Sequence, residues 1–454
     1  MSFAAQKNSM FLSILYAAIL WMASGCERAQ PNRQTTRDLT LPMSNGPTVR
    51  GSQTSPHKEP PSTLEVGPLK EPSSPRDEVE PAHKEASELR EDAEQALAKG
   101  DYQAALSSAS AAMRKEPADP ANVFLTATVL SSQHRYHEAV RMLDRLAEQV
   151  PDASLPVLGQ TAEWLVTQGD WQSAEARFRQ VIEAAPEAAI AHRQLAQLLL
   201  RQGRRVDAGK HLRQLCRLGD VSETELVTLL TISQPLPDDA DREAGEAIGA
   251  LGEAWSLASR QQWPEAIARL EPTARQSAAQ YGLLGRIHVE RRDPNALRQW
   301  ESGIVEPAWR ADPQLQLAIG ASQLANQEHE LAAASLRLAV QHDATDSLAR
   351  SLLADALNDD VLHDDAVQAE RDQAIAQAEA VLRTQTLAAQ IIVGKRDKAP
   401  LVQDLIAALQ SLERPFESLA WQVLDTIYQS GLTAEAKQQR INEINAQRLK
   451  LLKG

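Results

Sequence analysis

The fold is decided by the stretch KGDYQAALSSASAAMRKEP, residues 99–117, because the chain repeats its pattern three more times. The later copies are HRYHEAVRMLDRLAEQVP at 134–151, GDWQSAEARFRQVIEAAP at 169–186 and GRRVDAGKHLRQLCRLGD at 203–220. One alanine in each copy marks the register, with spacings of 34, 35 and 34 residues: Ala105, Ala139, Ala174 and Ala208. A period of this length indicates an array in which one supersecondary unit stacks on the next.

Each copy predicts two helices joined by a tight turn, and Gly100 and Gly169 supply a permissive backbone there. A second alanine lies twelve residues before the first in every copy, at Ala93, Ala127, Ala162 and Ala196. Two helices approach closely only where the facing side chains are small, so we expect the paired alanines to lie at the contact. An aromatic residue is expected to fill the space beside that contact in three copies: Tyr102, Tyr136 and Trp171.

These residues resemble the tetratricopeptide repeat, or TPR. The resemblance implies an all-α superhelix, a solenoid of stacked helix pairs. Less regular units around Ala266, Ala296, Ala332 and Ala366 bring the expected total to about eight, four strong and four degenerate. The predicted domains are a four-repeat array at 85–220, an irregular linker at 221–246, a degenerate array at 247–380 and a helical cap at 381–454. The last helix of the cap either solvates the end of the array or binds a partner or a membrane surface.

The N-terminus predicts export. Lys7 is followed by an uncharged apolar run, Met10–Ala23, which is too short to span a bilayer as a helix and suits the core of a secretory signal. The run A-S-G-C that ends at Cys26 resembles the bacterial lipobox, although Ala23 stands where leucine is usual. The resemblance implies a signal peptide at 1–25, a lipid on Cys26 and attachment to a membrane. An unmodified Cys26 or an uncleaved anchor are the alternatives.

Residues 26–84 are expected to form a disordered tether. The segment 27–84 contains ten prolines and no aromatic residue, so it cannot bury enough apolar surface to offset the entropy of ordering. The formal charges of residues 27–84 sum to zero, and Lys7 contributes +1 from the segment before them. Because the whole chain has a formal charge of -14, residues 85–454 carry -15. Such an acidic body repels phosphate backbones, and we therefore expect no nucleic-acid partner.

The sequence shows no signature of catalysis, so no catalytic residue, cofactor or metal is expected. GxSxG, GxGxxG, HExxH, CxxC and Walker-type motifs do not occur. His134 and His137 in HRYHE flank a predicted inter-helix turn, where a solvated turn is favoured over zinc. The acidic piece NDDVLHDD, residues 358–365, lacks the spacing of a calcium loop and also reads as a solvated turn. Cys216 is expected to be a small buried hydrophobe.

The remaining prediction is a binding groove, because the first helices of TPR units line a concave face. Projected onto this sequence, the TPR pattern places eight residues there: Arg90, Glu94, Phe124, Thr128, Glu163, Arg193, Gln197 and Arg201. The later units add Trp255, Asp355 and Asp359. We interpret the chain as a non-enzymatic, lipid-anchored scaffold of the bacterial cell envelope that binds a protein partner. The alternatives are a ligand-binding or enzyme-accessory protein with a pocket at 235–312, and a homo-oligomeric spacer.

Overall fold

The computed structural model describes residues 84–233, 246–303, 309, 311–358, 365–393 and 398–453. The predicted signal peptide, Cys26, Asp359 and all of the tether except Lys84 lie outside these residues. Within them every regular element is a helix, which confirms the all-α class. The chain divides into two compact units after Gln133.

The first unit contains α2 (Ala86–Ala98), α3 (Tyr102–Lys115) and α4 (Pro120–Ser132). Its helices begin at carboxylate caps: Asp101 accepts a hydrogen bond from the backbone of Ala104, and Asp119 from that of Ala121. A capped start suits these sequences because the first turn of a helix has unpaired N–H groups. The core of the unit is made mainly of small residues: Ala93, Ala105, Ala109, Leu125 and Val129.

The second unit starts with the remainder of the strong array. Its helices are α5 (Tyr136–Gln149), α6 (Ser154–Gln168), α7 (Trp171–Ala184), α8 (Ala189–Arg201), α9 (Arg205–Leu218) and the short α10 (Glu223–Leu230). A 3-10 turn at Pro151–Ala153 leads into α6, where proline stops the preceding helix. The register alanines of this part, Ala139, Ala174 and Ala208, are all 0% exposed.

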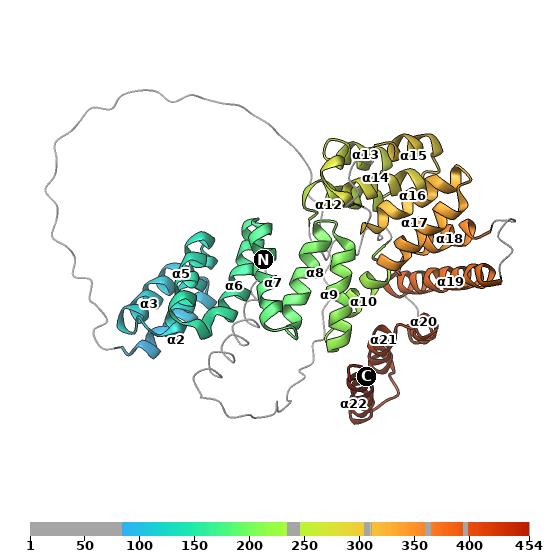
Figure 1. The fold of residues 1–454 in the computed structure, drawn as a ribbon. Helices are drawn as coiled ribbons and strands as arrows, with labels where there is room; N and C mark the ends of the chain where they lie inside the picture. The colour runs from blue at the N-terminus through green and yellow to red at the C-terminus, as the bar shows by residue number, and fades with distance from the viewer. Residues whose placement is uncertain are drawn as a thin grey trace, which may run out of the picture. The chain divides into compact units, whose positions relative to one another are not determined.

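The weaker half continues the alternation of helix pairs (Figure 1). Four pairs cover the expected degenerate array: α12 (Gly249–Ser259) with α13 (Trp263–Leu270), α14 (Ala278–Glu290) with α15 (Pro294–Glu301), α16 (Pro313–Ala325) with α17 (His329–His342), and α18 (Ser347–Ala356) with α19 (Asp365–Val393). A further pair, α20 (Ala399–Ser411) with α21 (Pro415–Tyr428), precedes α22 (Ala434–Leu451). The expected cap therefore contains one more hairpin, and its expected start at 381 falls inside α19.

One backbone geometry recurs at the turns between paired helices. A residue with positive φ lies two positions before the second helix in eight turns: Gly100, His134, Gly169, Gly203, Gln261, Arg292, Gln327 and Glu413. Glycine adopts this conformation at no steric cost, whereas the five other residues carry a modest penalty. The fold thus requires a positive φ at this position even where the residue is not glycine, which explains why glycine marks only some of the units.

The seam between paired helices is as tight in the weak units as in the strong ones. Twelve residues before Leu297 and Ala332, the positions of the upstream alanines are taken by Gly285 and Gly320. A Cβ on Gly285 would lie 2.5 Å from Cζ2 of Trp300 and 2.6 Å from Cβ of Ala318. A Cβ on Gly320 would lie 2.5 Å from Cγ of Leu336. In these units glycine stands where the strong units have alanine, because the facing side chains leave no room for a methyl group.

Three details of the expected register need correction. Ala366 is exposed at the start of α19, and the first buried residues of that helix are Ala374 and Ala378. In α15 the register position is taken by the buried Leu297, rather than by the neighbouring Ala296. Tyr102 is 42% exposed, so its ring only partly fills the space beside the contact between the paired alanines.

The C-terminal helices pack back onto the fourth repeat. Nζ of Lys398, just before α20, lies 2.7 Å from Oε1 of Glu223 in α10, and the Tyr428 hydroxyl donates to the same carboxylate. Five consecutive residues of α10 are buried, from Leu226 to Leu230. At the other end, a Cβ on Gly219 would overlap the guanidinium of Arg448 in α22. The C-terminal helices therefore do more than cover the end of the array, because they hold α10 in place.

The tight seam gives a prediction for Gly285. Gly285→Ala should lower the free energy of unfolding by about 1–3 kcal/mol, because the added methyl group has to displace Trp300 or Ala318. The measurement is the midpoint of urea unfolding followed by circular dichroism. Gly159→Ala is the matched control: it lies in α6, where a Cβ would meet nothing within 4 Å, and it should raise stability by up to about 1 kcal/mol. Equal midpoints for both variants would contradict the seam.

Candidate functional site

On α6 and α8, the first helices of two neighbouring repeats, the positions that the TPR pattern assigns to the inner face carry glycine and amide side chains. Gly159 contributes no side chain there, and an added Cβ would find open space. Gln160 and Gln194 are half-buried and Gln197 is exposed. None of these three amides has a hydrogen-bond partner among the described residues. An amide offers both a donor and an acceptor, so this row can pair with the backbone of an extended polypeptide.

The register of the repeats places these glutamines at corresponding positions of neighbouring first helices. Gln160 and Gln194 both lie fourteen residues before a seam alanine, Ala174 and Ala208 respectively. Gln197 lies one turn further along α8. It occupies the position that the half-buried Glu163 has in the preceding repeat. Of these residues, sequence reasoning selected Glu163 and Gln197 and missed both Gln160 and Gln194. Extending the 34-residue period to every polar residue of the first helices would have found them.

Two of the predicted groove residues tie successive repeats together. Nε of Arg193 lies 2.6 Å from Oε1 of Glu225, and its Nη2 lies 3.0 Å from Oδ1 of Asp220. In the first unit, Arg90 occupies the equivalent position and bonds to Asp119 and Asn122 of α4. Both guanidiniums thus anchor the start of the next first helix. They are therefore committed to the scaffold rather than free for a partner.

Other predicted groove residues are also engaged. Phe124 is 3% exposed and therefore packs in the core, which makes it unsuitable as an open binding surface. Thr128 donates its hydroxyl to the carbonyl of Phe124 at 2.8 Å. Burial raises the pKa of Glu94, a half-buried carboxyl of α2. Substitution of Phe124 would therefore disturb the core, and substitution of Arg193 would break its ion pairs with Glu225 and Asp220.

Arg201 marks the end of the open face. Its Nε donates to the carbonyl of Glu246 at 2.8 Å, and its guanidinium stacks over the Trp171 ring, 4.7 Å from the centroid. The backbone N–H of Ile248 donates to the carbonyl of Arg201 at 2.7 Å. Arg201 therefore connects α8 to the chain that enters α12. Of the groove residues predicted in the later units, Trp255 is only 5% exposed, whereas Asp355 is exposed.

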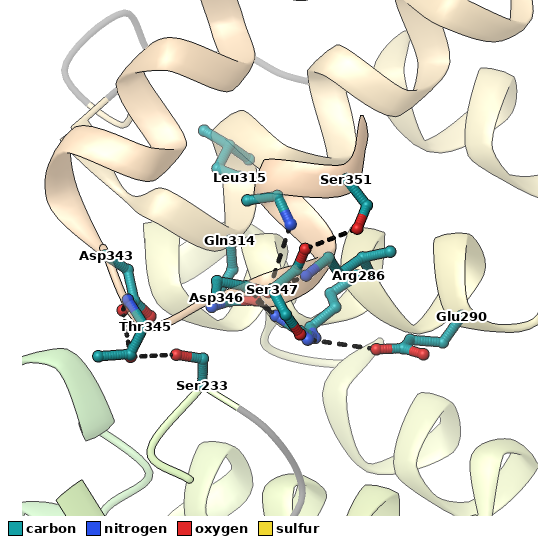
Figure 2. Close-up of polar contacts among 12 residues, drawn as sticks. Ser233, Arg286, Glu290, Gln314, Leu315, Asp343, Thr345, Asp346, Ser347 and Ser351 are labelled. Carbon is teal, nitrogen blue, oxygen red and sulfur yellow. Dashed lines mark hydrogen bonds and ion pairs between the residues drawn. The ribbon is translucent and has the colours of Figure 1, made fainter. Parts of the chain in front are cut away.

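In the C-terminal array the equivalent inner positions are filled by a buried polar network (Figure 2). Arg286 of α14 is 3% exposed; its Nη1 lies 2.8 Å from Oε1 of Gln314, and it pairs with Asp346. Asp346 also caps α18 by accepting from the backbone of Leu348 at 3.1 Å. The hydroxyl of Ser233, three residues after α10, lies 2.5 Å from that of Thr345. This array therefore uses its inner face internally.

Burial acts on both members of the Arg286–Asp346 pair. Alone it would lower the pKa of Arg286 and raise that of Asp346, because it disfavours both charged forms. The Asp346 carboxylate reverses the effect on the arginine, whose pKa is raised. Such a pair adds little stability as a unit, but removing one partner leaves a buried charge.

The Arg286 network yields a stability prediction. Arg286→Met should lower the free energy of unfolding by about 3–5 kcal/mol, because it strands the buried Asp346 carboxylate. Arg286→Met with Asp346→Asn should recover about 1–3 kcal/mol of that loss, since asparagine keeps an acceptor for the helix cap without the charge. Urea unfolding of the two variants measures the difference. No recovery in the double variant would show that the network is not coupled as described.

A cavity of about 490 Å³ lies in the second unit where α9, α12, α14 and α16 meet. It overlaps in part the pocket considered at 235–312, and Trp255 and Leu251 line its apolar side. Its polar side is largely occupied by internal contacts. Arg204 pairs with Asp207 at 3.0 Å and with Glu175 at 2.5 Å, and Lys210 also pairs with Asp207, at 2.9 Å. The cavity wall thus consists of groups that stabilise the start of α9 rather than a convergent catalytic set.

The remaining reactive side chains fit structural roles. Cys216 is 1% exposed, as expected for a buried hydrophobe, and burial raises the pKa of its thiol. His134 is exposed at the turn before α5, and His137 is exposed in the first turn of that helix. Nδ1 of His192 lies 3.0 Å from Nδ1 of His211, and burial is the main cause that lowers the pKa of His211 to about 4. In the described part of the chain, no three His, Cys, Asp or Glu side chains are grouped to hold a metal ion.

Comparison with known proteins agrees with the helical pairs. Residues 96–156 and 162–223 match two family models of the tetratricopeptide repeat. The chain therefore contains tetratricopeptide repeats where the sequence predicts its strong units, and its fold is that of a TPR solenoid. No match is found among curated protein sequences. Among the described helices, none is both long and apolar enough to cross a membrane.

Solved structures with similar folds have low sequence identity. A tetratricopeptide repeat protein from Parabacteroides merdae is 19% identical over 60% of this chain and 99% of its own length, with a TM-score of 0.28. The APC/C hetero-tetramer Cut9-Hcn1 is 15% identical over 81% of this chain and 85% of the matched one, with a TM-score of 0.30. Yeast Tom70 is 10% identical over 81% and 89%, with a TM-score of 0.23. Likeness at this level carries no conclusion about partners.

Proposed function

We propose that this protein is a lipid-anchored scaffold of the bacterial cell envelope, and that α6 and α8 bind an extended segment of a protein partner. TPR repeats are typical of protein–protein interaction scaffolds. The observation that carries the proposal is the row of unpaired amides of Gln160, Gln194 and Gln197 on an open inner face. An extended peptide needs such groups because its own N–H and C=O groups lose water on binding.

The C-terminal array has a different role in this proposal. Its inner face is occupied by the Arg286 network, and α10 is held against α19 and α21. It therefore stiffens the end of the open face instead of offering a second groove. A rigid scaffold lowers the entropy lost when a partner binds, which favours affinity for a flexible segment.

The amide row predicts the effect of removing two glutamines. Gln194→Ala with Gln197→Ala should weaken partner binding about 30-fold, which corresponds to the loss of two hydrogen bonds at about 1 kcal/mol each. The measurement is capture from an envelope extract, followed by titration of the captured partner. Alanine favours helices, so the helical content should not change.

The matched control carries Gln172→Ala and Gln180→Ala, two exposed glutamines of the second helix α7. This variant should bind the partner like the unchanged chain. If the two double variants weaken binding equally, the inner face of α6 and α8 is not the binding surface.

Membrane attachment rests on the sequence before the tether. The apolar run Met10–Ala23 followed by Ser24, Gly25 and Cys26 fits a lipidated cysteine after signal cleavage. Several acyl chains on one thiol and its amino group hold a protein stably, whereas one chain holds it only marginally. A tether of 58 residues, 27–84, then lets the repeats stand on the order of 40–45 Å from the bilayer.

The lipid proposal is tested by Cys26→Ala. The substitution should abolish incorporation of labelled fatty acid and release the protein from the membrane fraction, because it removes the thiol that would carry the lipid. Cys216→Ala serves as the control, since the only other cysteine is buried. Undiminished labelling of Cys26→Ala would contradict lipid attachment at this residue.

A further inference from the structure

The last described helix, α22, leads into a group of exposed leucines and lysines. Only Ile444 and Arg448 of this helix are buried. Leu449, Leu451 and Leu452 follow them and are 57%, 45% and 49% exposed. These three leucines form the densest group of exposed large apolar side chains in the described part of the chain.

The charge of this segment is opposite to that of the body. Residues 434–453 contain five basic and two acidic side chains, a net charge of +3. Because residues 85–454 carry -15, the remainder of the folded part carries -18. Lys450 and Lys453 flank the exposed leucines, and neither forms an ion pair with a described residue. The helix therefore ends in a basic and apolar surface on an acidic protein.

We propose that this surface, Leu449, Lys450, Leu451, Leu452 and Lys453, docks on an anionic lipid membrane. Leucines inserted at the boundary between headgroups and acyl chains lose contact with water, while lysine amines stay at the level of the phosphates. The acidic body does not prevent this contact, because salt screens charges more than about 8–10 Å away. The packing of Arg448 against Gly219 fixes the direction in which the surface projects from the fourth repeat.

An anionic membrane suits this surface better than a protein groove. The leucines are spread around the end of the helix, since successive residues point about 100° apart, and a groove would receive only one face. A fluid lipid surface can receive all of them together with both lysines. The docking rests in part on the proposed function, because the lipid on Cys26 would hold the protein beside a bilayer.

The test uses the full chain with Cys26→Ser, so that no lipid anchor contributes. Sedimentation with vesicles of phosphatidylcholine alone is compared with vesicles that also contain phosphatidylglycerol. The apolar segment 10–23 is common to all variants and contributes equally. We expect stronger binding to the anionic vesicles, and Lys450→Gln with Lys453→Gln should weaken it about 25-fold, at about fivefold for each lysine.

Leu449→Ser with Leu452→Ser should also weaken the binding, whereas Leu331→Ser with Leu382→Ser should not. The latter leucines are 56% and 53% exposed on α17 and α19 and are the matched control. Equal binding to both vesicle types, or equal loss in both leucine variants, would overturn the proposal. A change of oligomeric state in Leu449→Ser with Leu452→Ser, without loss of vesicle binding, would assign the surface to a second copy and overturn it as well. Failure of fatty-acid labelling at Cys26 would leave this result unaffected.

Discussion

The close approach of paired helices is the constraint on which the rest of the structure depends. Helices whose seams are filled by alanine or glycine pack at a short distance, because a small residue on one helix leaves room for the facing side chain of the other. Gly285, which meets both its own partner helix and the next pair, shows that one small residue can set both contacts. The size of the seam residues therefore determines how closely the helix pairs stack. The stacking in turn determines which residues lie on the inner and outer faces.

The two halves of the second unit use this architecture differently. In α6 and α8 the inner face is open and carries amides. In α14, α16 and α18 the same face is closed by Arg286, Gln314 and Asp346, and the chain after α10 reaches it through Ser233. Contacts from Lys398 and Tyr428 hold α10 in this position. The chain thus contains one inner face for partners and one for its own stability.

Much of this could be predicted from the sequence, and the limits have physical causes. The period of the alanines defined the strong helix pairs, because a seam alanine is under direct steric selection. The helices α20 and α21 were assigned to the cap and not counted as a repeat unit, since the pair has Ser418 rather than alanine at its seam and Glu413 rather than glycine at its turn. Periodicity places a residue on a face but does not show what covers it. For this reason Arg193 and Phe124 were assigned to the groove, although one is ion-paired and the other is buried.

The division between an open and a closed inner face is tested most directly by hydrogen exchange of the α10 amides in the full chain. Residues 223–230 form a short helix that would exchange rapidly by itself. If the C-terminal helices hold it, its buried amides should exchange at least about a thousandfold more slowly than an unprotected chain, as core helices do. Exchange of α10 at the rate of an exposed loop would contradict the account, because the C-terminal helices would then not hold α10 against the array.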